Sequence, residues 1–95
     1  MAASQRWAIV GGGMMGLSLA HQLTQDGQSV SIIEAGHNLG GLADAWQVGD
    51  ITWDRHYHVI LLSDSHLREL LEQIGLQDEF RWVETKTGFF TDGQF

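Results

Sequence analysis

The apolar residues in the first third of the chain follow a strand, helix, strand pattern. Residues 7–10 form a short continuous apolar run, which is typical of a strand buried on both faces of a parallel sheet. From Met14 onward apolar side chains recur every three or four residues, which predicts a helix, and Gly27 is placed to end it in a left-handed conformation. A β-branched run follows at residues 30–33. Residues 8–34 are therefore predicted to form one βαβ unit with parallel strands and a right-handed crossover.

Beyond this unit the pattern changes to loops and short apolar segments. Residues 35–41 contain three glycines and no hydrophobic periodicity, which predicts an irregular loop beside the strand ends. Residues 45–48 and 51–54 flank Gly49-Asp50, a two-residue connection typical of a hairpin, although the pattern leaves the register of the two strands open. We therefore expect a small antiparallel excursion after the βαβ unit.

The last third of the chain begins with a predicted amphipathic helix. Ser63 and Asp64 are both suitable N-terminal caps, and Gly75 is placed to end the helix. Its apolar face consists of Leu67, Leu70, Leu71 and Ile74. Residues 80–83 and 88–91 are predicted strands, followed by the turn dipeptide Asp92-Gly93. The second arm of that hairpin is missing, so we expect residues 80–95 to begin an inserted substrate-domain sheet in a longer protein.

Composition narrows the classes of protein. With 95 residues the chain is shorter than a nucleotide-binding sheet with helices on both faces normally requires. A content of 43% hydrophobic and 18% charged residues is that of a folded globular protein. The net charge of −7 disfavours nucleic acid as a partner, and the lack of cysteine excludes disulfides and thiol chemistry. The sequence contains no apolar run long enough for a signal peptide or a membrane span, and we expect a cytoplasmic protein.

The main chemical motif lies between the first strand and the helix. Residues 11–16 read Gly-Gly-Gly-Met-Met-Gly and have the Gly-x-Gly-x-x-Gly spacing of a dinucleotide-binding loop. In that interpretation Gly11 permits a tight turn, Gly13 lets the backbone approach a pyrophosphate, and Gly16 allows the helix to pack closely on the strand. The helix N-terminus would then offer N–H groups and a partial positive charge to the phosphates. A merely flexible glycine turn is the alternative.

An acidic residue stands where a dinucleotide site requires one. Glu34 lies 23 positions after Gly11, at the end of the second predicted strand. This is close to the spacing of about 20 at which a carboxylate accepts from a ribose 2′-hydroxyl. A carboxylate there repels a 2′-phosphate, so the residues disfavour NADP and leave FAD or NAD. A solvated glutamate at a strand end is the alternative.

A glycine pair completes a two-part signature. Together with residues 11–16 and Glu34-Ala35, the pair Gly40-Gly41 resembles the N-terminal FAD signature of the flavin-containing amine oxidase, protoporphyrinogen oxidase and phytoene desaturase superfamily. The specific part covers residues 8–41, and a looser resemblance, closest to the desaturase branch, extends to residue 82. It implies a Rossmann-like α/β fold, the incomplete N-terminal part of an FAD domain of the glutathione reductase type.

The resemblance also implies roles for individual residues. The three motif glycines would approach the FAD pyrophosphate, Glu34 would hold the adenosine ribose, and Gly40-Gly41 would pass beside the phosphates and the ribityl chain. The full implied set is Gly11, Gly13, Met14, Met15, Gly16, Glu34, Ala35, Gly40, Gly41, Leu42, His56 and His58. Two positions depart from the family pattern. Leu42 stands where many relatives carry Arg or Lys, and His56 stands where many carry glycine.

Two short clusters beyond the signature are open to several interpretations. His56 and His58 would share one face of an extended segment, where contact with a flavin, metal ligation and ordinary hydrogen-bonded packing are the alternatives. Metal is the least favoured, because no third ligand follows at a clear spacing. For the neighbours Asp54 and Arg55 the default expectation is a local ion pair. The sequence assigns no catalytic residue and no metal ligand.

For the whole protein the resemblance implies an FAD-dependent oxidoreductase. Such an enzyme transfers hydride or its equivalent from a C–N or C–C bond of a small-molecule substrate to FAD, and then to an acceptor that the sequence does not identify. A peripheral membrane surface is also compatible with the family. The alternatives are a non-redox flavoenzyme resembling UDP-galactopyranose mutase and an NAD-linked dehydrogenase. We expect the 95-residue chain alone to be inactive.

Overall fold

The computed structural model describes residues 5–95, and the chain divides into two compact units, of which the first ends at Leu61 and the second begins at Leu62. The first unit contains β1 (Arg6–Val10), α1 (Met14–Gln25), β2 (Ser29–Ile33), the short 3-10 turn η1 (Gly41–Ala43), β3 (Ala45–Val48) and β4 (Ile51–Asp54). The second unit contains α2 (Ser65–Gln73) and the 3-10 turn η2 (Gln77–Glu79). In the described part of the chain, no helix is long and apolar enough to cross a membrane.

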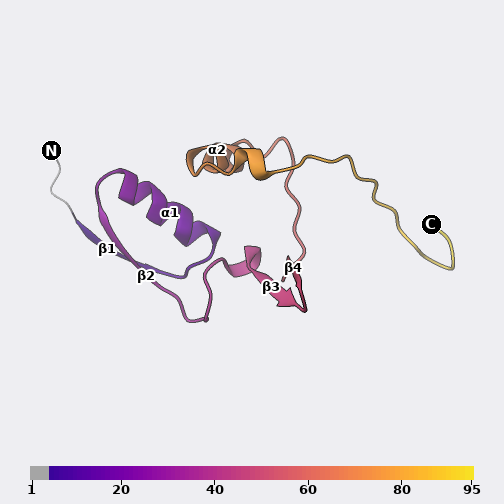
Figure 1. The fold of residues 1–95 in the computed structure, drawn as a ribbon, viewed down its shortest axis with the longest axis horizontal. Coiled ribbons are helices and arrows are strands. Elements are labelled where there is room, and N and C mark those ends of the chain that lie inside the picture. Colours follow the sequence, from indigo (N-terminus) through magenta and orange to yellow (C-terminus); the bar gives the residue numbers. More distant parts are fainter. Residues whose placement is uncertain (1–4) are drawn as a thin grey trace. The chain divides into compact units, whose positions relative to one another are not determined.

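The first unit contains the predicted βαβ arrangement. Strands β1 and β2 pair in parallel, with Trp7 opposite Val30 and Val10 opposite Ile33, and α1 connects them along one side of the pair (Figure 1). The helix α1 packs against both strands, and Ala20 is its buried residue. The chain therefore has the predicted Rossmann-like α/β fold.

Both long helices end in the same backbone motif. After α1, Gly27 has a φ of +78°, its N–H donates to the carbonyl of Thr24, and the N–H of Gln28 donates to the carbonyl of Leu23. These two bonds define a Schellman motif, which satisfies the last carbonyls of the helix. Gly75, with a φ of +75°, ends α2 through the equivalent pair of bonds. Both predicted helix ends are confirmed.

The predicted antiparallel excursion is a hairpin of β3 and β4. Val48 pairs with Ile51 across the two-residue turn, in which Gly49 has a φ of +62°. A positive φ at the first central residue alone fits a type II′ turn, whose twist matches that of paired strands. The backbone N–H of Arg55 donates to the carbonyl of Asp44 at 3.1 Å, so the register continues one pair beyond the strands. The register places Arg55 directly beside the segment that follows Gly40-Gly41.

The prediction that residues 7–10 are buried on both faces is wrong. Trp7 is 44% exposed and Val10 is 83% exposed. The sheet has two strands, and α1 covers one of its faces, so among the described residues of this unit no layer covers the other face. Among the described residues only Ala20 and Leu71 are buried apolar side chains. The apolar content of the sequence therefore exceeds the core that these residues form.

The predicted strands at 80–83 and 88–91 are also wrong. The described chain has no strand after β4, because residues 80–90 find no backbone partner with which a ladder could form. The turn at Asp92-Gly93 is confirmed, since both residues have positive φ and Thr91 exchanges two backbone hydrogen bonds with Gln94. That residues 80–95 begin a substrate domain stays a prediction.

Candidate dinucleotide-binding site

The glycine loop connects the end of β1 to the start of α1. Gly11 turns the chain with a φ of +103°, and its N–H donates to the carbonyl of Ile33 at 2.8 Å. Gly13 is the N-cap residue of α1, and its carbonyl accepts the first helical hydrogen bond from Leu17 at 2.9 Å. The loop is thus fixed to the end of β2 on one side and to the helix on the other.

The first turn of α1 is a source of hydrogen-bond donors. The N–H groups at the start of a helix have no carbonyl of their own helix to bond, and the helix dipole makes this end positive. Met14 and Met15 supply these groups, and their side chains are 42% and 87% exposed. This end of α1 suits an anion, in particular a phosphate.

Gly16 marks the closest approach of α1 to β1. A Cβ atom at this position would overlap the carbonyl oxygen of Gly11 and lie 3.3 Å from the Cγ2 of Ile9. Gly13 differs, because a Cβ there would meet only the Cα of Gly41, at 3.9 Å. The backbone at Gly13 is therefore open to a ligand, whereas the space at Gly16 is filled by the protein itself.

The carboxylate of Glu34 fixes the glycine loop from the end of β2. One of its oxygens accepts from the N–H of Gly12 at 2.8 Å, and the other accepts from the N–H of Gly36 at 2.7 Å. The bond from Gly36, and next the bond from Gly12, lower the pKa of Glu34 below its ordinary value. Each oxygen keeps a further lone pair, so this anionic group can also accept from a ribose hydroxyl.

The second glycine pair lies against the first loop. The N–H of Gly40 donates to the carbonyl of Gly12 at 2.8 Å, and Gly13 and Gly40 form an isolated parallel bridge. Gly40 and Gly41 have φ values of +115° and +57°, which favour glycine. A Cβ on Gly41 would lie 3.0 Å from the Cα of Gly13. Two segments that are distant in the sequence thus form one surface of bare backbone.

A cavity of about 450 Å³ borders this surface. Its lining residues are Glu34, Gly36, His37, Asn38, Gly41, Asp44, Arg55 and His56. The Nη1 of Arg55 lies 3.5 Å from a carboxylate oxygen of Asp44. Arg55 therefore forms an ion pair, as expected, and its partner is Asp44, which lies opposite it in the hairpin. Asp54 pairs with Ala45 at the end of the hairpin.

The remaining predicted site residues are the two histidines, Ala35 and Leu42. His56 lines the cavity, whereas the Nδ1 of His58 lies 2.9 Å from the backbone carbonyl of His56. Ala35 is exposed between the two glycine loops. Leu42 belongs to η1 and is 76% exposed. Because its side chain is apolar, it offers no polar group to a ligand.

Sequence reasoning missed two features of this site. The N–H groups of Gly12 and Gly36 bind Glu34, although neither glycine was assigned a role. Arg55 lines the cavity because the hairpin register places it opposite Asp44. The two-residue turn Gly49-Asp50 was the available signal, since counting outward from it gives this pairing.

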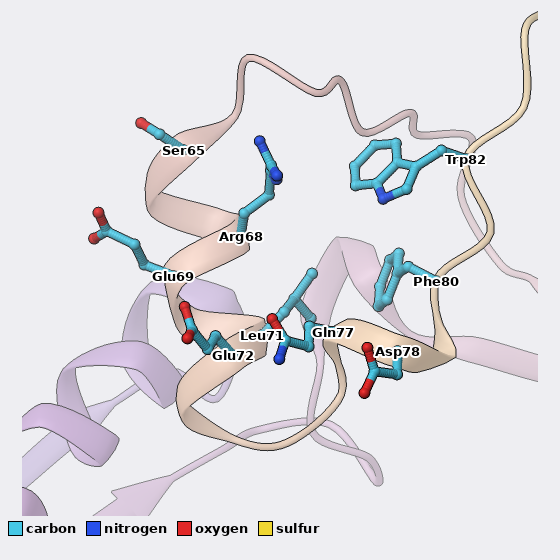
Figure 2. Close-up of a pocket in the computed structure, with 9 residues that line it drawn as sticks. All are labelled: Ser65, Arg68, Glu69, Leu71, Glu72, Gln77, Asp78, Phe80 and Trp82. Carbon is cyan, nitrogen blue, oxygen red and sulfur yellow. The ribbon is translucent and has the colours of Figure 1, made fainter.

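The second unit has a cavity of a different kind, about 340 Å³ in volume (Figure 2). Its lining residues are Ser65, Arg68, Glu69, Leu71, Glu72, Gln77, Asp78, Phe80 and Trp82. Arg68 donates to the carbonyl of Leu62 at 3.0 Å, and the rings of Phe80 and Trp82 lie 6.4 Å apart. The carboxylates of Glu69, Glu72 and Asp78 are exposed.

The first unit therefore has the parts of a dinucleotide site. Backbone donors at the start of α1, two glycine segments without side chains and an anionic acceptor at the end of β2 lie together. These are the groups that a pyrophosphate and its adjoining ribose require. The residues present fit a dinucleotide.

Comparison with known proteins agrees with this geometry. Residues 9–74 match the family described as NAD(P)-binding Rossmann-like domain, and the chain belongs to that family. It is a dinucleotide-binding region related to flavin oxidoreductases, and its distant relatives include desaturases and oxidases.

Three relatives illustrate that range. The chain is 31% identical over 77 residues to a 15-cis-phytoene desaturase of Glycine max, covering 80% of this chain and 14% of the relative. It is 27% identical over 77 residues to protoporphyrinogen oxidase 2 of Arabidopsis thaliana, covering 81% and 15%. It is 32% identical over 89 residues to an L-amino acid oxidase of Cerastes cerastes, covering 90% and 17%. The chain thus spans only about a seventh to a sixth of the length of these relatives.

Proposed function

We propose that this chain is the FAD-binding region of a flavin-dependent oxidoreductase of the amine oxidase and desaturase type. The observation that carries the proposal is the joining of the two glycine segments by the Gly40 to Gly12 hydrogen bond, with the Glu34 carboxylate bonded to the same loop. A dinucleotide that lies across this surface meets backbone donors at its phosphates and an acceptor at its ribose.

The chain's own residues bind and orient the cofactor. Gly13, which has no side chain, admits the pyrophosphate to the positive end of α1. Glu34 holds the adenosine ribose. The N–H groups of Gly36 and Gly12 donate to the Glu34 carboxylate, and these two hydrogen bonds keep it in place and ionised. When bound, FAD accepts hydride or its equivalent from a C–N or C–C bond of a small-molecule substrate. We further propose a cytoplasmic location.

The choice of FAD rests on the two-part signature. A single glycine loop and an acidic residue also suit NAD. The description of the matched family names NAD(P) binding. NAD is therefore the second candidate. The pair Gly40-Gly41 favours FAD, because it belongs to the FAD signature that the chain resembles and contacts the first loop directly. The relatedness to desaturases and amino acid oxidases also supports FAD.

Purification of the full-length protein tests the proposal. We expect a yellow protein with a flavin absorption spectrum that releases FAD on denaturation. Calorimetry with FAD and with NAD separates the two candidates, since we expect binding of FAD only. A colourless protein that binds NAD but not added FAD would overturn the proposal.

A further inference from the structure

The feature of interest is the position of Arg55 relative to the glycine surface. The hairpin register places its backbone opposite Asp44, and Asp44 directly follows η1, which begins at Gly41. Arg55 and Gly41 line the same cavity, and Gly41 lies against Gly13. The fold thus brings one guanidinium to the backbone surface that fits a pyrophosphate.

With a diphosphate bound, this surface would carry an excess of negative charge that a nearby cation could offset. The cavity lining carries two carboxylates, Glu34 and Asp44, and a bound diphosphate would add two further negative charges. The chain has five Lys and Arg residues in all, and only Arg6 and Arg55 belong to the first unit. Arg6 lies at the opposite end of β1 from the glycine loop. Among the described residues of this unit, Arg55 is the one permanent cation at the cavity.

The contacts of Arg55 hold it in place without using up its donors. Its Nη1 is 3.5 Å from Asp44, and its side chain is 54% exposed. A guanidinium has five N–H donors in a planar fork that matches two phosphate oxygens. The side chain of Asp44 is 19% exposed, and its Cβ lies beside Gly40.

We propose that Arg55 binds the pyrophosphate of the dinucleotide and that Asp44 positions it. The proposal rests on the proposed function, and it gives the hairpin a role in cofactor binding. The exposed Leu42 of η1 has no charge to offer to the phosphates, whereas Arg55 reaches the cavity from the hairpin. The helix N-terminus and Arg55 would then face the diphosphate from two elements of the same unit.

Titration of the apo form of the full-length protein with FAD tests this proposal. We expect Arg55→Gln to raise the Kd for FAD about tenfold or more, and Arg55→Lys to raise it less, because it keeps the charge but loses the fork. Arg6→Gln is the matched control, with the same charge change at the far end of β1, and we expect a change of less than about twofold. Equal urea midpoints of the apo forms would show that the variants are folded.

Two measurements separate phosphate binding from a structural role. The affinity gap between wild type and Arg55→Gln should narrow as ionic strength rises from about 0.01 M to about 1 M, since the Debye length falls from about 30 Å to about 3 Å. Asp44→Asn leaves the Arg55 charge present and should weaken FAD binding far less than Arg55→Gln. Equal losses in the two variants, without salt dependence, would overturn the proposal.

The outcomes also separate this proposal from the proposed function. If wild type binds FAD and Arg55→Gln binds it equally well, the role of Arg55 is wrong and the FAD assignment stands. If wild type itself does not bind FAD, the proposed function fails and the role of Arg55 fails with it.

Discussion

At the scale of single residues, the site depends on one side chain that bonds two backbone amides. The Glu34 carboxylate accepts hydrogen bonds from the N–H groups of Gly12, which precedes it in the chain, and Gly36, which follows it. It therefore fixes the glycine loop and the loop after β2 next to the strand ends. The same bonds favour its ionised form. A residue that its spacing marks as a candidate ribose acceptor thus also shapes the glycine loop.

The two backbone hydrogen bonds to Glu34 predict a pH dependence of stability. Its pKa is lowered in the folded state, so the stabilisation is fully present above the ordinary glutamate pKa of about 4.3 and is lost as pH falls through the lower folded value. In urea denaturation of the full-length protein, we expect Glu34→Gln to be less stable than wild type near pH 7. The difference in free energy of unfolding between Glu34→Gln and wild type should shrink below about pH 4.

Glu84→Gln is the matched control, since it removes the same charge at an exposed position. Near neutral pH, the free energy of unfolding of Glu84→Gln should differ from that of wild type by less than that of Glu34→Gln does. A Glu34→Gln protein as stable as wild type across this range would show that the two amide bonds contribute nothing to folding.

At the scale of elements, the βαβ unit depends on how closely α1 approaches β1. Gly16 permits that approach, because any Cβ there would overlap the Gly11 carbonyl oxygen. Gly13, three residues earlier, has open space at the Cβ position. The two glycines of one motif therefore differ: Gly16 is required for packing, whereas Gly13 leaves open space.

This difference predicts opposite consequences for two alanine variants of the full-length protein. Gly16→Ala forces the helix away from the strand and should lower the free energy of unfolding by about 1–3 kcal/mol. Gly13→Ala replaces an N-cap glycine and should cost about 1 kcal/mol or less, yet its methyl group should weaken FAD binding about tenfold or more.

Urea denaturation and FAD titration of the same preparations measure both effects. Gly88→Ala is the control, because a Cβ there meets only the Phe95 ring at an ordinary 3.5 Å. Wild-type FAD affinity in a stable Gly13→Ala protein would contradict the assignment of Gly13 to the pyrophosphate.

At the scale of the whole molecule, these residues bury little apolar surface. Of the described apolar side chains only Ala20 and Leu71 are buried, while large ones such as Met15, Leu42 and Phe89 are more than 75% exposed. Hydrophobic burial is the main force that offsets chain entropy, and small cores leave little net stability. The uncovered face of the β1–β2 sheet is where further layers of a doubly wound fold would pack.

The small core predicts the behaviour of the isolated 95-residue chain. We expect a broad urea transition of low midpoint, association through exposed apolar surface and sheet edges, and FAD binding far weaker than that of the full-length protein. Sedimentation and FAD titration of the two proteins side by side measure this. A monodisperse monomer with a sharp transition and full-length affinity for FAD would refute the expectation.

Local signals were sufficient for the βαβ unit and for the helix ends. The apolar runs, the glycine spacing and the glycines that end both helices act over a few residues, and the structure has each of them. Burial of residues 7–10 and the strands at 80–83 and 88–91 were mispredicted. Both depend on partners elsewhere, because a strand needs a second strand and a buried face needs a covering layer.

The sequence by itself determined the parallel strand pair, the glycine loop, the acidic residue at the end of β2 and the position of the glycine pair Gly40-Gly41. These features follow from backbone requirements that only certain residues meet. The tertiary structure decided that Gly40 bonds Gly12, that Gly36 and Gly12 bond Glu34, and that Arg55 reaches the same cavity through Asp44. The physical reason is that strand register and loop closure, which no local pattern specifies, set which distant residues meet.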